Sequence, residues 1–163
     1  MILSGKAIKF GDNIDTDVIL PGKYLVLTDP DELGKHAMEG IATDFVANSR
    51  KGSIVVAGEN FGQGSSREQA PVALKAAGVR CVLAGSFARI FYRNSFNIGL
   101  PVLECPGISS KVEEGDEMSI DLEEGKINDA TNGLSMTANP IPDFLLTILK
   151  DGGIIEHLRR KRR

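Results

Sequence analysis

The stretch SIVVAGENFGQGSSREQAPVALKAAGVRCVLAG, residues 53–85, decides the fold class of this chain. Two short apolar runs rich in β-branched residues, 53–58 and 79–85, flank a glycine-rich loop and a helix-like run over Pro71–Ala77. Gly78 follows that run as a helix stop. The order of strand, glycine-rich loop, helix and strand predicts a βαβ unit, and therefore a parallel sheet in an α/β domain.

The segments on either side extend this unit. Residues 88–97 predict a second helix that ends before Gly99 and Pro101, and the apolar residues 102–104 predict a further parallel strand. At the N-terminus, apolar residues between Ile2 and Phe10 predict a strand that breaks at the turn-rich sequence GDNIDTD, residues 11–17. A long loop interrupted by prolines should follow, with a short helix near Leu33–Met38.

The last third of the chain has a different pattern. Residues 115–133 alternate at period two around Glu123-Glu124-Gly125, which predicts a β-hairpin with one polar face. A final helix should end at Gly152, and its apolar stripe is formed by Phe144, Leu145, Ile148 and Leu149. The expected architecture is one compact α/β domain over residues 1–163, a mixed β-sheet with flanking helices.

Composition narrows the possible functions. The chain has 163 residues, 42% of them hydrophobic, and a formal net charge of -3, with basic residues clustered only in the tail at 159–163. A nucleic-acid face needs basic residues spread over the folded surface, so we predict a solvated tail instead. The sequence has neither an apolar run of membrane-spanning length nor a signal-peptide pattern, and we expect a cytoplasmic protein.

The two cysteines exclude one class of site in this chain. Cys81 and Cys105 stand apart, without a C-x-x-C spacing or further thiols, so they cannot hold a zinc ion or an iron–sulfur cluster by themselves. We expect both to be buried and inert, and we predict no metal site in this chain.

The glycine-rich loop admits two interpretations. Ser65 and Glu68 have the spacing of a capping box, although Pro71 requires either a separate turn before the helix or a kink in it. Alternatively, the free N–H groups of the loop bind an anion, and Arg67 offers a two-pronged donor that suits a carboxylate. The spacing matches no nucleotide-binding motif. A small carboxylic acid is therefore the better ligand, but residue chemistry leaves capping and anion binding both open.

Three motifs together indicate a family. GDNIDTDVILPGKYL (11–25), ENFGQGSSREQAP (59–71) and SFARIFYRNSFNIGLP (86–101) resemble, in order and spacing, the small subunit of 3-isopropylmalate dehydratase, which is the swivelling domain of the aconitase superfamily. The resemblance covers residues 1 to about 150. It implies a hydro-lyase that removes water from a 2-hydroxy acid and adds it back on the neighbouring carbon. It also implies a large-subunit partner that carries a 4Fe-4S cluster on three cysteines, with no cofactor in this chain.

The resemblance also implies residue roles. Ser65 is similar to the general base that takes a proton from carbon, Ser66 and Arg67 to binders of a substrate carboxylate, and Asp17 to the acid that orders the charged site. From the residues alone, the acidic segment around Asp17 would be an ordinary turn, because its spacing does not fit a calcium loop. Gln69 departs from the family, since many relatives carry histidine at that position.

The early loop bears on the substrate. Relatives that act on substrates with an extra carboxylate, such as homoaconitase, have arginine after the tyrosine and leucine of this loop, where this chain has Val26 and Leu27. An apolar side chain leaves a carboxylate unpaired, so an isopropyl group and leucine biosynthesis are favoured. Other methyl-substituted malates, and simple packing of Val26 and Leu27, remain open. Rival function classes are a stand-alone anion-binding module and a structural partner of a larger enzyme.

Overall fold

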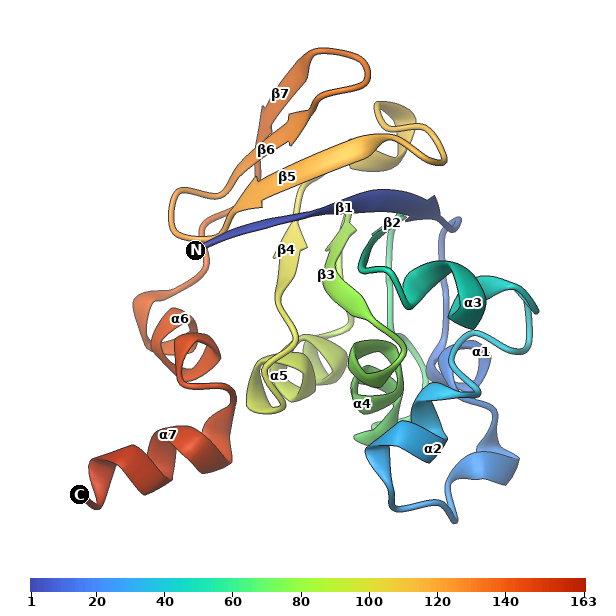
Figure 1. Cartoon of the computed structure of the whole chain (residues 1–163), viewed down its shortest axis with the longest axis vertical. Helices are drawn as coiled ribbons and strands as arrows, with labels where there is room; N and C mark the ends of the chain where they lie inside the picture. Colours follow the sequence, from blue (N-terminus) through green and yellow to red (C-terminus); the bar gives the residue numbers. More distant parts are fainter.

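The computed structural model describes residues 1–163 and contains a single seven-stranded sheet with the order β4-β3-β2-β1-β5-β6-β7 (Figure 1). The strands are β1 (Ile2–Lys9), β2 (Ser53–Ala57), β3 (Val79–Ala84), β4 (Val102–Glu104), β5 (Glu117–Asp121), β6 (Lys126–Asp129) and β7 (Leu134–Thr137). The first four are parallel to one another and the last three are antiparallel. The predicted mixed sheet is confirmed.

The parallel half contains the predicted βαβ unit. Every residue of β2 is buried, which explains why its sequence is a continuous apolar run rather than an alternating one. Neighbouring parallel strands are in register through pairs such as Ala7 with Ile54 and Val82 with Val102. Because β1, β2 and β3 run in the same direction, the loops that follow them leave the sheet at one common edge.

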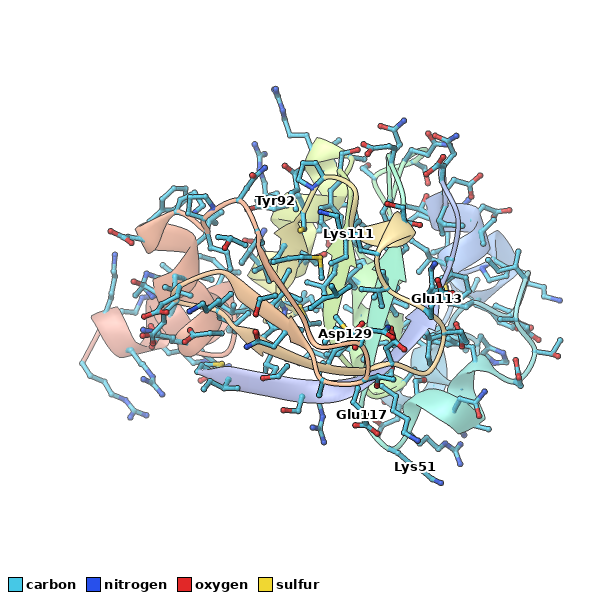
Figure 2. The ribbon with its side chains drawn as sticks, turned by 90° about the horizontal axis from the view of Figure 1, so that it is seen from above. Lys51, Tyr92, Lys111, Glu113, Glu117 and Asp129 are labelled. Atoms are coloured by element: carbon cyan, nitrogen blue, oxygen red, sulfur yellow. The ribbon has the colours of Figure 1, made fainter.

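The antiparallel half forms a separate layer at the top of the molecule in Figure 1. The hairpin of β5 and β6 is confirmed, with Ile120 opposite Ile127 and alternate side chains buried. The sequence analysis missed β7, which has no fully buried residue and therefore lacks a hydrophobic signal. From above, this layer lies across the parallel strands, with Asp129 near its centre (Figure 2).

The helices flank the sheet, and α4 and α5 lie below β3 and β4 in Figure 1. They are α1 (Thr16–Ile19), α2 (Pro30–Gly34), α3 (Phe45–Ser49), α4 (Gln69–Ala76), α5 (Arg89–Asn97), α6 (Asp143–Lys150) and α7 (Ile154–Lys161), with 3-10 turns η1 (Gly22–Tyr24) and η2 (Ile108–Ser110). None of these helices combines the length and the apolarity that a membrane crossing requires.

The early helix begins before its predicted position, Leu33–Met38. Asp29 caps α2 by accepting a hydrogen bond from the Asp31 N–H at 3.0 Å, and Pro30 occupies the first helical position. Proline is well suited to that position because its φ angle is already helical and its missing N–H would have no partner there. The sequence pair Asp29-Pro30 was the signal that the prediction overlooked.

The capping box, one of the two interpretations that the sequence left open for the glycine-rich loop, is absent. The N-cap of α4 is Glu68, and no side chain caps the helix. Pro71 is the third residue of α4, where a backbone N–H has no intrahelical partner, so neither a kink nor a separate turn is needed. The two serines before the helix are therefore free of the role that the simpler interpretation gave them.

The C-terminal segment also departs from expectation. Ile148 and Leu149 of α6 are buried as predicted, but Phe144 is 68% exposed, because it lies in the first turn on the side away from the core. The basic residues 159–161 belong to the helix α7, which the sequence analysis missed, and all are solvent-exposed. Cys81 and Cys105 are both buried as expected, and burial raises the pKa of each thiol.

Candidate functional site

The loop after β1 and the loop after β2 are joined by backbone hydrogen bonds along their length. The Asn13 N–H donates to the Glu59 carbonyl at 2.7 Å, and the Gly62 N–H donates to the Ile14 carbonyl at 2.7 Å. The Thr16 N–H donates to the Gln63 carbonyl at 2.9 Å. These bonds fix the acidic motif beside the glycine-rich loop, at the common edge where the parallel strands end.

Two of the three aspartates in the acidic motif have structural roles. Asp12 accepts a hydrogen bond from the Glu59 N–H at 2.8 Å, and its carboxylate occupies the space that a side chain at Gly58 would need. Asp15 caps α1 by accepting from the Val18 N–H at 2.9 Å. Asp12 therefore links the two loops and Asp15 caps a helix, whereas Asp17 pairs with a charged side chain of the glycine-rich loop.

The third motif supports the glycine-rich loop from beneath. Phe61 is fully buried, its N–H donates to the Ser86 carbonyl at 3.0 Å, and its ring packs edge-on against Phe91 with centroids 5.3 Å apart. Gly62 has a φ of 84° and its Cα lies so close to the Phe91 ring that a Cβ would not fit. The aromatic residues of this motif thus fix the position of the glycine-rich loop relative to α5.

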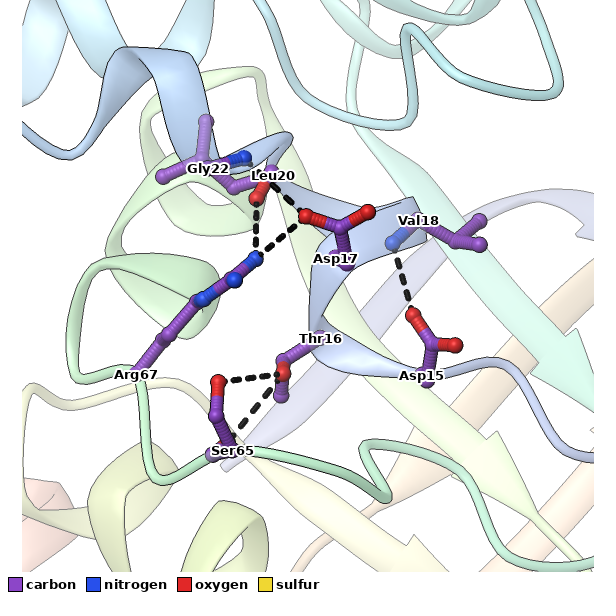
Figure 3. A network of polar contacts seen from close by, with 8 residues as sticks. All are labelled: Asp15, Thr16, Asp17, Val18, Leu20, Gly22, Ser65 and Arg67. Atoms are coloured by element: carbon purple, nitrogen blue, oxygen red, sulfur yellow. Dashed lines mark hydrogen bonds and ion pairs between the residues drawn. The ribbon is translucent and has the colours of Figure 1, made fainter.

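Arg67 connects the two loops through an ion pair with Asp17 (Figure 3). Its Nη1 donates to Asp17 Oδ1 at 2.7 Å and to the Leu20 carbonyl at 3.2 Å. The hydrogen bond from Arg67 and then that from the Gly22 N–H lower the pKa of the Asp17 carboxyl. Arg67 Nε and Nη2 donate to no atom of the chain, so two prongs of the guanidinium remain available for an anion.

Ser65 and Ser66 lie on the exposed crest of the same loop. The Ser65 Oγ is 3.2 Å from the Oγ1 of Thr16, whereas Ser66 makes no side-chain hydrogen bond. The backbone N–H groups from Gly64 through Gln69, where α4 begins, also have no partner within the chain. A run of unpaired N–H groups at a helix N-terminus next to a guanidinium favours a negatively charged ligand.

The early loop is anchored so that Val26 faces outward. The Tyr24 ring stacks on His36 with centroids 3.7 Å apart, and a hydrogen bond to Glu39 raises the Tyr24 pKa. Leu27 is half-buried against the core, while Val26 is 84% exposed. The packing interpretation therefore fits Leu27 and leaves Val26 as the apolar side chain open to a ligand or a partner.

The structure brings most of the predicted site residues together. Ser65, Asp17 and Arg67 belong to one network of polar contacts, and Ser66 lies between Ser65 and Arg67 in the sequence. Val26 lies outside this network, with its side chain exposed to solvent. The sequence analysis missed Thr16, which is the central residue of the DTD motif. A small hydroxyl residue between two aspartates, one of which caps the helix, is the signal that would have identified it.

The site is an open surface rather than a cavity. A cavity of about 490 Å³ lies near the beginning of β2, at the opposite edge of the sheet, and Lys6, Lys51 and Glu117 contribute to its lining. The chain also has no group of three or more side chains suited to a metal ion, and its two thiols are separate and buried. These residues do not fit an iron–sulfur cluster.

Comparisons with known proteins show which family this chain resembles. Residues 9–107 match the family model of the aconitase C-terminal domain. The 3-isopropylmalate dehydratase small subunit of Halothermothrix orenii is 53% identical over 98% of this chain and 96% of its own length. The isopropylmalate/citramalate isomerase small subunit of Methanocaldococcus jannaschii is 51% identical over 98% of this chain and 95% of its own. A crystal structure of 3-isopropylmalate dehydratase from that organism superposes with a TM-score of 0.94 at 42% identity, covering 99% of this chain and 96% of the other.

Proposed function

Because the chain belongs to the family of 3-isopropylmalate dehydratase small subunits, which carry the aconitase C-terminal domain, we propose that its serine loop is the proton-transfer and carboxylate-binding half of a hydro-lyase site. The reaction is the isomerisation of 2-isopropylmalate and 3-isopropylmalate by loss and readdition of water, a step of leucine biosynthesis. The observation that carries this proposal is the free edge of the Arg67 guanidinium beside the unpaired N–H groups of Ser65 and Ser66.

Ser65 is the proposed base. A serine hydroxyl is normally far too weak an acid to ionise, so its oxyanion needs fixed donors around it. Unpaired backbone N–H groups from Gly64 to Gln69, the start of α4 and Arg67 together supply such donors without a histidine. The loop is also held rigidly through Thr16 and Phe61, which lowers the cost of organising the donors for the reaction.

Arg67 and Ser66 are the proposed carboxylate binders. Asp17 holds one prong of the guanidinium at 2.7 Å and thereby sets the plane of the other two. A planar fork of this kind matches the two oxygens of a carboxylate, which a lysine would meet only as a point charge. Ser66 carries the neighbouring free hydroxyl. Asp17 acts through Arg67, since its own carboxylate is engaged with that guanidinium and with the Gly22 N–H.

Val26 is the residue proposed to contact the alkyl group of the substrate. Its side chain is 84% exposed in this chain, yet the loop beneath it is anchored through Tyr24 and His36. An exposed apolar side chain on an anchored loop suits contact with an isopropyl group once the partner covers the site. A smaller methyl-substituted malate is the natural second substrate, because one relative of this chain is named for isopropylmalate and citramalate together.

The large subunit is the proposed carrier of the 4Fe-4S cluster. The name small subunit, which the relatives share, implies a large-subunit partner. The exposed serine loop needs a second surface to exclude water, and Cys81 and Cys105 cannot supply cluster ligands from the core. The complete site therefore lies between the two chains.

The test is an assay under anaerobic conditions with the reconstituted pair. The large subunit is the aconitase-like chain with a three-cysteine pattern from the same genome. We expect turnover of 2- and 3-isopropylmalate by the pair, and none by this chain alone, which should purify without iron or sulfide. Turnover by the isolated chain, or a pair active on homoaconitate but not on isopropylmalate, contradicts the proposal. Including citramalate in the panel decides the second substrate.

A further inference from the structure

Thr16 is a buried residue whose hydroxyl contacts only Ser65. Its side chain is almost fully enclosed, with 2% of the residue exposed. The Thr16 Oγ1 lies 3.1 Å from the Ser65 carbonyl oxygen and 3.2 Å from the Ser65 Oγ. Figure 3 marks both contacts with dashed lines. Gly64, the residue before Ser65, has a φ of 98°, a conformation that favours glycine.

The backbone holds Thr16 on both sides. Its N–H donates to the Gln63 carbonyl at 2.9 Å, and its carbonyl accepts from the Leu20 N–H at 2.9 Å. It is the first residue of α1, behind the Asp15 cap. A β-branched side chain in a helix has few χ1 rotamers, so the position of the hydroxyl oxygen is well defined while its proton remains free to rotate.

The two contacts give this proton two alternative acceptors. Thr16 has a single O–H proton. When the Ser65 hydroxyl is neutral, Thr16 can donate to the Ser65 carbonyl while its Oγ1 accepts the Ser65 proton. When the Ser65 hydroxyl is ionised, the Thr16 proton can rotate to the Ser65 Oγ. We propose that Thr16 is a positioning residue that orients the Ser65 hydroxyl and stabilises its oxyanion, an inference that rests on Ser65 being the base.

The proton balance of the step is simple. The Ser65 oxyanion takes a proton from the substrate carbon: the C–H bond breaks, its electron pair stays on the substrate, and a new O–H bond forms on Ser65. Thr16 neither gains nor loses a proton. Its hydroxyl rotates back to the Ser65 carbonyl, and its oxygen again accepts from the Ser65 hydroxyl.

The test compares Thr16→Val with Thr16→Ser in the reconstituted complex. Valine keeps the shape of threonine and removes the hydroxyl, whereas serine keeps the hydroxyl and removes the methyl group. Because hydrogen bonds to charged groups contribute about 1.5 to 3 kcal/mol, we expect kcat to fall about 10- to 100-fold in Thr16→Val with KM nearly unchanged. Thr16→Ser should stay within a few-fold of wild type. The primary deuterium isotope effect on kcat should rise in Thr16→Val, because proton removal becomes slower.

Each alternative gives a distinct result. An active Thr16→Val with an impaired Thr16→Ser means that the methyl group matters for packing and overturns the inference. In a Ser65→Ala background, Thr16→Val should cause no further loss, and an additional loss of similar size also overturns it. If Ser65→Ala itself is fully active, the proposed base is wrong. If Thr16→Val does not fold, a comparison of Thr16→Ala with Thr16→Ser replaces it. The control is Thr147→Val on α6, because the Thr147 hydroxyl also donates to a backbone carbonyl but lies outside the proposed site.

Discussion

Two clusters of polar side chains in this molecule differ in how many of their hydrogen-bonding groups find partners inside the chain. The site cluster consists of Asp17, Ser65, Ser66 and Arg67 at the ends of the parallel strands. The hairpin cluster consists of Asp116, Asp129 and Asn132 in the antiparallel layer. In the site cluster Arg67 is half-buried, the other three residues are exposed, and several donors have no partner. The carboxylates of the hairpin cluster are almost completely buried.

The polar groups of the hairpin cluster form hydrogen bonds with one another and with nearby backbone N–H groups. Asp129 accepts from the N–H groups of Thr131 and Asn132, and the Asn132 side chain donates to Asp116 at 2.7 Å. A hydrogen bond from the Glu113 N–H lowers the pKa of Asp116, but desolvation and the neighbouring Asp129 carboxylate outweigh it, so the pKa is raised. Such a closed network stabilises a turn. The contrast indicates that unpaired donors, rather than the number of charges, distinguish the proposed binding site.

The largest expected effect separates the two clusters by activity. Ser65→Ala should reduce turnover of the reconstituted pair about 10²- to 10⁴-fold, because a proton acceptor is lost, while the fold and partner binding persist. Ser135→Ala, at an exposed serine of the hairpin layer, is the matched control and should be neutral. A dead Ser66→Ala beside an active Ser65→Ala would place the base one residue later.

Arg67→Lys should be the next most damaging change. Lysine keeps the charge but loses the fork that reaches Asp17, the Leu20 carbonyl and the substrate together. We expect kcat/KM to fall about 10- to 100-fold, as for the loss of a charge-assisted hydrogen bond. Arg159→Lys, the same substitution at an exposed position of α7, is the control and should leave kcat/KM unchanged. Equal activity of the two variants would mean that Arg67 serves only to hold the loops together.

Val26→Arg tests the substrate assignment. A guanidinium beside an alkyl group has no partner, but it can pair with a carboxylate on the same arm of the substrate. The preference for a homoaconitate-type substrate over 3-isopropylmalate, measured as the ratio of kcat/KM values, should rise about tenfold. Val26→Leu should leave the ratio unchanged. An unchanged ratio in an active Val26→Arg complex means that Val26 does not face the substrate.

The smallest expected effect is on stability, at the hairpin. Because the pKa of Asp116 is raised in the folded state, the stability of the wild type declines as pH rises from the unfolded value near 3.8 through that raised pKa. Asparagine imitates the protonated carboxyl. The melting temperature of Asp116→Asn should therefore exceed that of wild type at about pH 8 and match it near pH 4. A variant less stable than wild type at about pH 8 would contradict the raised pKa of Asp116. Turnover of the reconstituted pair should not change.

The sequence predicted the parts of the fold that local patterns determine. Periodicity located β2, α4, β3 and the hairpin, and the three motifs supplied the residues of the proposed site. It failed at β7, which has no fully buried residue, and at α7, because Gly152 was interpreted as the end of the last helix and the basic residues as a solvated tail. Phe144 was placed in the core because its spacing fits the stripe, but α6 turns that residue to solvent.

Within the proposed site, the sequence indicated which residues are present more readily than which of them have structural roles and which are free to bind a ligand. The acidic motif offered three aspartates, and only the backbone partners of Asp12 and Asp15 reveal that those two are structural. The capping box at Ser65 was plausible by spacing, yet α4 begins at Gln69 and leaves both serines free. Contacts between loops about 50 residues apart in sequence, such as Thr16 with Ser65, have no local signature.

The most direct test of the account is hydrogen exchange at the reacting carbon of the substrate. The reconstituted complex is incubated with 3-isopropylmalate in deuterated water, and loss of the carbon-bound proton is followed by NMR. The account predicts exchange with the wild-type small subunit and with Ser135→Ala. It predicts none above background with Ser65→Ala, although that complex still binds the substrate. Exchange at the wild-type rate in the Ser65→Ala complex would show that another group removes the proton and would contradict the central claim.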